Sequence, residues 1–328
     1  MSAAILEVRA LRTRFRAPGG TLEAVRGVDL DLHEGEVLGL IGESGSGKTV
    51  TGLSILRLLP ESASTEATLL RFRGRELGGL SSEAFRALRG SHLAMVFQNP
   101  AGAFNPAKTV AWHLSETFRR RAARGREAGR REAVADWRAA AETLLREVGI
   151  AEPARILRLY PHQLSGGMLQ RVLIAMVLAL EPDLIIADEP TTNLDNIVER
   201  QILALFRRLQ RKVAASIVFI THDMTVAAAL CDRVAVMYAG EIVELGPAAE
   251  VFNSPKHPYT QGLVATATAL SGGGRLREIP GEPPSAFERL PGCHFAPRCS
   301  HVRAACTAAQ PTMRRVGAVH EARCVLYD

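Results

Sequence analysis

The sequence predicts an α/β protein: a mostly parallel sheet with an added antiparallel edge, an inserted helical subdomain and a small irregular carboxyl-terminal extension. Three observations predict this fold. Short apolar or β-branched runs alternate with helix-like patterns through residues 1–246, which is typical of a parallel sheet flanked by helices. Residues 99–164 have helical periodicity and no strand signal. Proline and glycine recur near the carboxyl end, where they favour loops.

The strands of the expected core are short runs that end at turn or helix patterns. They cover residues 5–8, 37–41, 93–97, 184–188, 217–221 and 234–238. We therefore assign residues 1–98 and 165–246 to the core, residues 99–164 to the helical subdomain and residues 247–328 to the extension. The sequence contains no internal repeat, so a single core is expected.

Composition and charge limit the class of protein. Hydrophobic residues make up 47% of the 328 positions, which is enough for a sizeable core. The first residues lack the basic start, apolar block and cleavage site of a secretory signal, and no uninterrupted apolar run reaches about 18 residues. We expect an intracellular chain whose membrane contact is peripheral. The net charge of +6 would suit nucleic acid, anionic lipid or a nucleotide, and a solvated arginine-rich surface explains it equally well.

A glycine-rich segment follows the strand expected at residues 37–41 and precedes an apolar, helix-compatible run. Its residues are Gly42, Glu43, Ser44, Gly45, Ser46, Gly47, Lys48 and Thr49. The spacing is G-x-x-x-x-G-K-[ST], in which glycines let backbone N–H groups wrap nucleotide phosphates at a helix N-terminus. Lys48 would reach the β- and γ-phosphate oxygens, and the Thr49 hydroxyl would bind Mg²⁺. The alternative is a glycine turn before an ordinary helix.

A second apolar strand, residues 184–188, ends in a pair of carboxylates, Asp188 and Glu189. One carboxylate can hold Mg²⁺ through water while the next orients or deprotonates the attacking water. A solvated sheet edge is the alternative reading of such a pair. Together with the glycine-rich segment, the pair predicts a P-loop NTPase core.

A short polar motif stands between these two segments and immediately before a long apolar-periodic helix. The motif is Leu164, Ser165, Gly166 and Gly167. Serine and glycine can open a helix whose free N–H groups form an anion site, although such capping is common in isolated helices. With the phosphate loop, this LSGG motif resembles the signature motif of the ATP-binding subunits of ABC transporters. The resemblance implies that two subunits pack head to tail, each ATP lying between one phosphate loop and the other subunit's signature helix.

The same resemblance assigns roles to two residues nearer the amino end. Gln98 follows the apolar strand of residues 93–97 and looks like the family's Q-loop glutamine, which senses Mg²⁺ and water and links to the membrane partner. Thr49, Gln98 and Asp188 would then surround Mg²⁺. Phe15 looks like the aromatic residue that stacks on adenine, with a core phenylalanine as the alternative.

Two further family positions lie beyond the acidic pair. Asn193, Leu194 and Asp195 resemble the D-loop, although the family more often has alanine where Asn193 stands. His222, after the strand of residues 217–221, looks like the switch histidine that contacts the γ-phosphate and positions Glu189. A satisfied polar residue is the usual reading of a lone strand-end histidine.

Four of the five cysteines lie near the carboxyl end at the spacing C-x₅-C-x₆-C-x₁₇-C. They are Cys293, Cys299, Cys306 and Cys324. In a reducing compartment, clustered thiols bind metal more often than they form disulfides. Four thiolates suit zinc or an iron–sulfur cluster, and the wide gaps favour the cluster over a C-x₂-C zinc site. Free structural cysteines are the alternative. Cys231, in an apolar setting, is assigned to the core.

The extension narrows the resemblance. "HPYTQGL" with "GCHFAPRC" and a late cysteine resembles the carboxyl extension of oligopeptide and dipeptide importer ATPases, some of which carry a [4Fe–4S] cluster on four such cysteines. One departure is Leu169, where that subfamily usually has arginine after LSGGM. Losing that charge would weaken a contact beside the signature helix.

The resemblance implies an ATP- and Mg²⁺-dependent ATPase that powers peptide import from the cytoplasmic face of a membrane, with Glu189 and His222 as its catalytic residues. The implied partners are a second ATPase subunit, more often different than identical, two permease subunits and an extracytoplasmic solute-binding protein. Import of nickel, glutathione or another small solute is the alternative. A soluble ATPase of the same family acting on nucleic acid is a more distant one, because such proteins carry fused cassettes or a long coiled coil that this sequence lacks.

Overall fold

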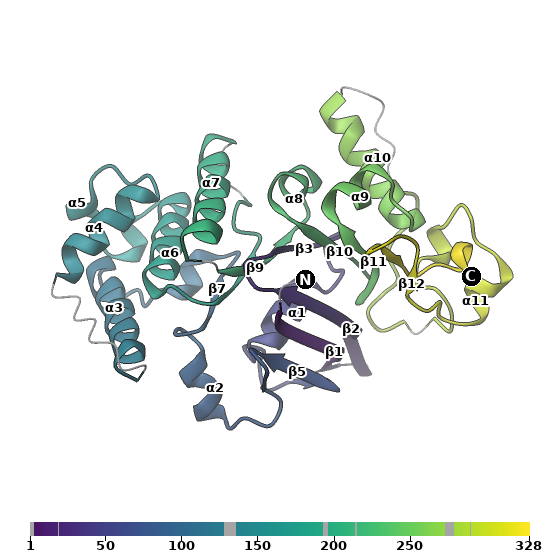
Figure 1. Ribbon diagram of the computed structural model, residues 1–328, viewed down its shortest axis with the longest axis horizontal. Coiled ribbons are helices and arrows are strands. Elements are labelled where there is room, and N and C mark those ends of the chain that lie inside the picture. The colour runs from purple at the N-terminus through teal and green to yellow at the C-terminus, as the bar shows by residue number, and fades with distance from the viewer. Residues whose placement is uncertain are drawn as a thin grey trace. The chain divides into compact units, whose positions relative to one another are not determined.

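The computed structural model describes residues 3–18, 20–127, 136–192, 196–213, 215–272, 279–288 and 290–328 (Figure 1). The chain forms two compact units. The first contains Met1–Gly78 and Val218–Asp328, and the second contains Gly79–Ile217.

An antiparallel sheet forms one part of the first unit. Two 14-residue strands, β1 (Ala4–Ala17) and β2 (Gly20–His33), pair along their length, and Leu6 faces both Leu32 of β2 and Phe72 of β5. The strand order is β2-β1-β5-β6, with β4 also paired to β1. The three smaller strands are β4 (Ala63–Glu66), β5 (Leu69–Phe72) and β6 (Arg75–Glu76). The antiparallel strands predicted at the amino end are confirmed, but they form a sheet of their own and are not an edge of the parallel sheet.

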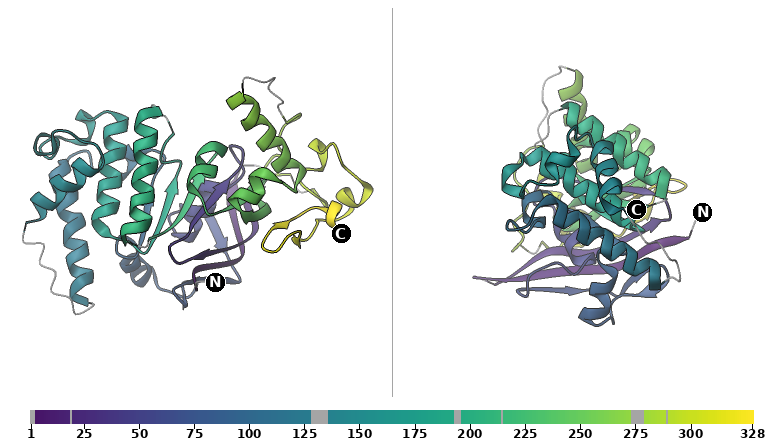
Figure 2. Two further views of the ribbon diagram at one scale, coloured as in Figure 1. Left: turned by 45° about the horizontal axis from the view of Figure 1, so that its top comes forward. Right: turned by 90° about the vertical axis from the view of Figure 1, so that its left-hand side faces the viewer.

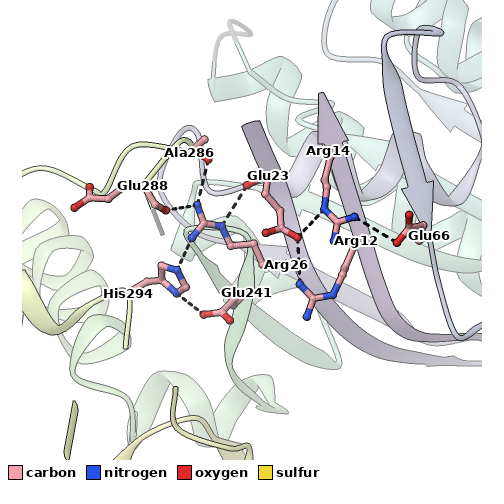
Figure 3. Close-up of polar contacts among 9 residues, drawn as sticks. All are labelled: Arg12, Arg14, Glu23, Arg26, Glu66, Glu241, Ala286, Glu288 and His294. Atoms are coloured by element: carbon pink, nitrogen blue, oxygen red, sulfur yellow. Dashed lines mark hydrogen bonds and ion pairs between the residues drawn. The ribbon is translucent and has the colours of Figure 1, made fainter. Parts of the chain in front are cut away.

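The first strand extends well beyond the predicted residues 5–8. The prediction missed the rest of the strand because that part is not apolar. Arginines alternate there with inward-facing residues, and their charges are paired across the hairpin. The Arg9 guanidinium contacts Asp31 at 2.7 Å. Arg12 and Arg14 contact the same Glu23 oxygen at 3.1 and 3.3 Å (Figure 3). A strand with one charged face lacks the apolar run on which the prediction depended.

A second sheet in the first unit supports the glycine-rich loop. Its strand order is β12-β13-β11-β10-β3-β9. β10 runs parallel to β3 and antiparallel to β11, and all five residues of β3 are buried. The strands are β3 (Val37–Ile41), β9 (Ser216–Thr221), β10 (Arg233–Tyr238), β11 (Glu241–Pro247), β12 (Arg314–Arg315) and β13 (Glu321–Ala322). The helices of this unit are α1 (Lys48–Ile55), α8 (Met224–Leu230), α9 (Ala248–Asn253), α10 (Pro258–Gly272) and α11 (Ala304–Ala308).

The carboxyl-terminal extension adds to this second sheet. β13 pairs with β11, so that Ala322 faces Glu244. The Glu244 carboxylate is fully buried, accepts hydrogen bonds from the backbone N–H groups of Lys256 and His257, and contacts His320 Nε2 at 2.7 Å. A buried carboxylate is stable only with such partners, so Glu244 fastens both ends of the extension to the sheet.

A polar network joins the extension to β2 of the hairpin. The Arg26 guanidinium donates to the carbonyl oxygens of Ala286, at 3.3 Å, and Glu288, at 2.9 Å. It also contacts His294, whose other ring nitrogen lies 2.8 Å from Glu241 (Figure 3). The extension therefore packs on the hairpin as well as on the sheet.

The second unit is largely helical, and α3, α4 and α7 pack against α6 (Figure 2). β7 (Leu93–Val96) and β8 (Leu184–Asp188) pair in parallel. The helices are α2 (Ser82–Leu88), α3 (Val110–Glu127), α4 (Trp137–Glu147), α5 (Pro153–Ile156), α6 (Gly166–Leu180) and α7 (Asn196–Val213). Among the described residues, no helix is both long and apolar enough to cross a bilayer.

Candidate functional site

Two glycines of the phosphate loop cannot be replaced without moving backbone. Gly42, directly after β3, has φ +153°, and a Cβ there would lie 2.2 Å from the Met237 carbonyl oxygen of β10. Gly47 has φ +104°, and its Cβ would lie 2.5 Å from the Ala24 carbonyl oxygen of β2. Only glycine tolerates these positive φ angles together with such short distances to carbonyl oxygens. Tight packing of the loop against β2 and β10 therefore explains the spacing of the motif.

Lys48 lies at the centre of the loop. It is the first residue of α1, and its side chain is buried. Its ammonium donates to the carbonyl oxygens of Gly42 and Glu43, both at 2.8 Å. The Ser46 carbonyl oxygen accepts from Gly240 N–H at 2.9 Å, which fixes the loop's second half. A buried cation at a helix N-terminus is an arrangement suited to phosphate.

The other predicted nucleotide residues of the first unit have definite places. Thr49 is the second residue of α1 and is half-buried. Phe15 is half-buried near the end of β1 and pairs with Leu22 and Ala63. His222 follows β9 directly and is exposed. Their assigned roles remain predictions.

The acidic pair closes β8 in the second unit. Asp188 is its last residue and is 3% exposed. Glu189 adopts φ +44°, a left-handed conformation that costs a residue with a Cβ about 1–3 kcal/mol and is typical of functional sites. Its Oε2 atom accepts from Gln98 Nε2 at 3.0 Å and from Thr192 Oγ1 at 2.9 Å. The structure thus brings together Glu189 and Gln98, which are far apart in sequence.

Thr192 was not among the residues predicted from the sequence. It stands three positions after Glu189, within the stretch "DEPTT", and its backbone N–H also donates to the Glu189 carbonyl oxygen at 3.2 Å. The only sequence signal for Thr192 was its spacing from Glu189, which lets a threonine hydroxyl hydrogen-bond to the carboxylate within a turn.

The signature motif opens α6 as predicted. Ser165 is the N-cap, and its hydroxyl accepts from Met168 N–H at 3.3 Å. Ser165 and Gly166 are exposed, and a Cβ at Gly166 would meet nothing within 4 Å. A cavity of about 610 Å³ lies beside the motif and is lined in part by Ser165, Gly167 and Met168. The helix end is therefore open to an approaching group.

Leu169 and the predicted D-loop complete the comparison with the predicted site. Leu169 is 7% exposed, so in this chain the position usually held by arginine packs in the interior of the second unit. The predicted D-loop residues lie outside the described part of the chain; they are Asn193, Leu194 and Asp195.

The four carboxyl-terminal cysteines lie in one region of the extension. Cys293 N–H donates to the Cys306 carbonyl oxygen at 2.7 Å. Burial, with a smaller contribution from the nearby Cys306 and Cys324 thiols, raises the pKa of Cys293 to about 11. Burial also raises the pKa values of Cys299 and Cys324, so neutral thiols are favoured at pH 7.

The predicted metal site receives no geometric support. Within the described ranges, no three His, Cys, Asp or Glu side chains are placed so that they could hold one metal ion. The fifth cysteine, Cys231, is buried against Gly39 of β3, and burial raises its pKa to about 12. Its assignment to the core is confirmed.

Comparisons with known proteins match both parts of the chain. The ABC transporter family model matches residues 25–192, and the model of the oligopeptide/dipeptide transporter carboxyl-terminal region matches residues 243–306. The dipeptide transport ATP-binding protein DppD of Bacillus subtilis (strain 168) is 43% identical over 326 residues, which cover 99% of this chain and 95% of DppD. A putative peptide import ATP-binding protein of Brucella melitensis biotype 1 is 43% identical over 337 residues, covering 99% of this chain and 97% of that protein.

Solved structures of ABC transporter cassettes also match the chain. The dimeric structure of MJ0796, a bacterial ABC transporter cassette, is 25% identical with a TM-score of 0.63, covering 74% of this chain and 98% of the cassette. A post-hydrolysis dimer of the same cassette, bound to ADP and Pi, matches with the same TM-score of 0.63.

Proposed function

This chain belongs to the ATP-binding subunits of ABC transporters, and we propose that it hydrolyses ATP to power the import of dipeptides or oligopeptides. The observation that carries the proposal is the 43% identity to a dipeptide transport ATP-binding protein over 99% of the chain, extension included. The match of the extension to the oligopeptide/dipeptide transporter region favours peptides over nickel, glutathione or another small solute.

ATP and Mg²⁺ are the cofactors that an ABC ATPase uses, and we assign their contacts to the residues described above. Lys48, Thr49 and the loop residues 42–47 bind the phosphates, and Phe15 stacks on adenine. Thr49, Gln98 and Asp188 would hold Mg²⁺, which would neutralise charge on the phosphates. Glu189 activates the attacking water, and His222 contacts the γ-phosphate. The open helix end at Ser165 and the orientation of Glu189 by Gln98 support these roles.

The proposed assembly contains two ATPase subunits and two permease subunits on the cytoplasmic face of the membrane, supplied by an extracytoplasmic solute-binding protein. The motif of residues 164–167 faces the ATP of the second subunit, which we propose to be a different chain. The D-loop of residues 193–195 is assigned to the contact between the two subunits. In this assignment residues 1–98 and 165–246 form the ATPase core, residues 99–164 form the helical subdomain and residues 247–328 form the extension.

The function is tested by reconstituting the chain with its permease in lipid vesicles. We expect peptide-loaded binding protein to stimulate ATP hydrolysis at least about tenfold and to drive peptide accumulation, because closure of the ATPase pair is coupled to transport. If binding proteins loaded with nickel or glutathione stimulate ATP hydrolysis instead, the transported solute belongs to the alternative class. Stimulation by DNA or RNA without permease would contradict the importer function.

We also propose that Cys293, Cys299, Cys306 and Cys324 hold a [4Fe–4S] cluster, with zinc as the alternative. The proposal is supported by their position in one looped region that has little apolar core of its own. A cluster binds each thiolate at a different iron atom, so its sulfurs lie farther apart than the ligands of a single ion. That difference is compatible with the lack of a single-ion site among the described side chains.

Metal loading of the cysteines is expected to depend on pH. Since burial raises the thiol pKa values, Cys293 to about 11, binding must remove protons and weakens as pH falls. Anaerobically purified protein is expected to contain iron and sulfide and to absorb visible light as iron–sulfur proteins do. This absorption should be lost faster at pH 6 than at pH 8. Zinc in place of iron would select the alternative, and metal-free protein with full transport activity would contradict both.

A further inference from the structure

We infer that the carboxyl-terminal extension positions the phosphate loop, through Arg298 and Tyr259 acting on Glu43. The inference rests on the proposed function, in which residues 42–49 bind nucleotide phosphates. It adds two residues from outside the nucleotide-binding motifs to the machinery that sets ATP affinity.

Glu43, the second residue of the phosphate loop, is held by all of its polar groups. Its backbone N–H donates to the Tyr259 hydroxyl at 2.8 Å, and its carbonyl oxygen accepts from Lys48 at 2.8 Å. Its carboxylate receives both arms of the Arg298 guanidinium, at 2.8 and 3.2 Å. Two of these three partners, Tyr259 and Arg298, belong to the extension.

Arg298 is built into the extension as a rigid support. Its side chain is 5% exposed. Besides Glu43, it donates to the carbonyl oxygens of Pro280, at 3.0 Å, and Ile279, at 3.1 Å, and to the Tyr238 hydroxyl at 3.4 Å. These contacts use the full set of guanidinium donors. A bidentate pair of this kind fixes direction as well as charge, so Arg298 holds Glu43 in one place.

An aromatic cluster connects the two supporting residues to the sheet. The ring of Tyr238, at the end of β10, lies 4.6 Å from that of Tyr259 and 5.3 Å from that of Phe295. The Tyr259 and Phe295 rings are 5.5 Å apart, and Arg298 lies 5.8 Å above the Tyr238 ring. Packing of this type favours a single arrangement, so the support is continuous from β10 to the loop.

The role of this support follows from Lys48. Its ammonium now bonds the Gly42 and Glu43 carbonyl oxygens, and it must give up those bonds to reach a bound phosphate. Arg298 and Tyr259 make their contacts with other atoms of Glu43, so they keep the loop in place when Lys48 turns to the nucleotide. A preformed loop binds phosphate without the cost of ordering backbone. Removing the support should therefore weaken nucleotide binding more than the chemical step.

The test measures binding of ATP and ADP by the full chain and steady-state hydrolysis in its assembly. Arg298→Ala is expected to weaken binding of both nucleotides about tenfold and to raise KM for ATP by a similar factor, with kcat kept within about twofold. Glu43→Gln, which keeps shape and removes charge, should give a comparable loss. The double variant should lose no more than about twofold beyond the larger single loss, because the pair acts as a unit. Arg298→Lys should recover part of the affinity, since it keeps charge without the fork.

Arg314→Ala is the matched control, because its ion pair with Asp328, at 3.1 Å, lies in the same extension with both side chains largely exposed. It should leave nucleotide binding unchanged. Unchanged affinity in folded Arg298→Ala overturns the inference, as do additive losses in the double variant. If Arg298→Ala fails to fold, unchanged affinity in Glu43→Gln overturns it instead. Lys48→Ala separates a failure of this inference from a failure of the proposed function. If Lys48→Ala also binds ATP normally, the proposed phosphate site has failed.

Discussion

Glu189→Gln is expected to lower ATP hydrolysis at the site that contains it at least about a hundredfold while changing ATP affinity less than about threefold. The amide keeps the shape of the carboxylate and can still accept the hydrogen bonds that Gln98 and Thr192 donate to Oε2, at 3.0 and 2.9 Å. It cannot take a proton from water, so the loss falls on the chemical step. The local backbone, held at φ +44°, should not change.

Glu181 provides a closely matched control for this variant. It is also a glutamate with a positive φ, +48°, in the second unit, and it pairs with Arg121 at 2.9 Å. Glu181→Gln should leave hydrolysis within about twofold, because an exposed ion pair contributes little. Nucleotide titration and phosphate release, measured on both variants in the assembled transporter, separate binding from chemistry. Normal turnover by Glu189→Gln would remove Glu189 from the catalytic role.

Local sequence was sufficient where burial was complete. Residues 37–41 and 184–188 were predicted as strands, and β3 and β8 have those same limits with every residue buried. Ser165 was predicted to open a helix, and it is the N-cap of α6. Strands buried on both faces are continuous apolar runs, and capping residues act on neighbours within three positions. These signals are contained in the segment itself.

Long-range contacts were not accessible in the same way. The part of β1 beyond residue 8 is stabilised by pairing with Glu23 and Asp31, partners that no local pattern identifies. The contact of Arg298 with Glu43 joins residues 255 positions apart, and the sequence around Cys299 suggested only a metal site. Glu189 was assigned a role from its motif, whereas its left-handed backbone and its contact with Thr192 follow from the folded chain.

Ser165→Arg is the second variant for which we expect a large effect. It tests whether this chain completes an ATP site on another subunit. Ser165 is exposed at an open helix end, where a long cationic side chain would block an approaching nucleotide. Hydrolysis at the ATP site that Ser165 completes should fall at least about a hundredfold, while ATP binding to the isolated chain should stay within about twofold. Ser81 caps α2 in the same way, accepting from Ala84 N–H at 3.2 Å, so Ser81→Arg controls for the loss of a cap, which costs about 1 kcal/mol.

Mixing subunits that carry Ser165→Arg with subunits that carry Glu189→Gln shows which subunit supplies which part of each ATP site. In the proposed head-to-tail pair, a Ser165→Arg subunit keeps its own phosphate loop and Glu189, and a Glu189→Gln subunit offers it an intact Ser165. One of the two sites is then complete, so mixed pairs should regain up to about half of the parent activity although each variant alone is inactive. Recovery requires that the chain pairs with itself. If it pairs with a different ATPase, Ser165→Arg in this chain and the glutamate change in the other subunit disable the same site, so the pair should keep about the activity of either single change. Ser165→Arg and Glu189→Gln together in this chain should then remove both sites. Full hydrolysis by a monomeric Ser165→Arg chain would contradict a shared site, because every catalytic group would then lie within one subunit.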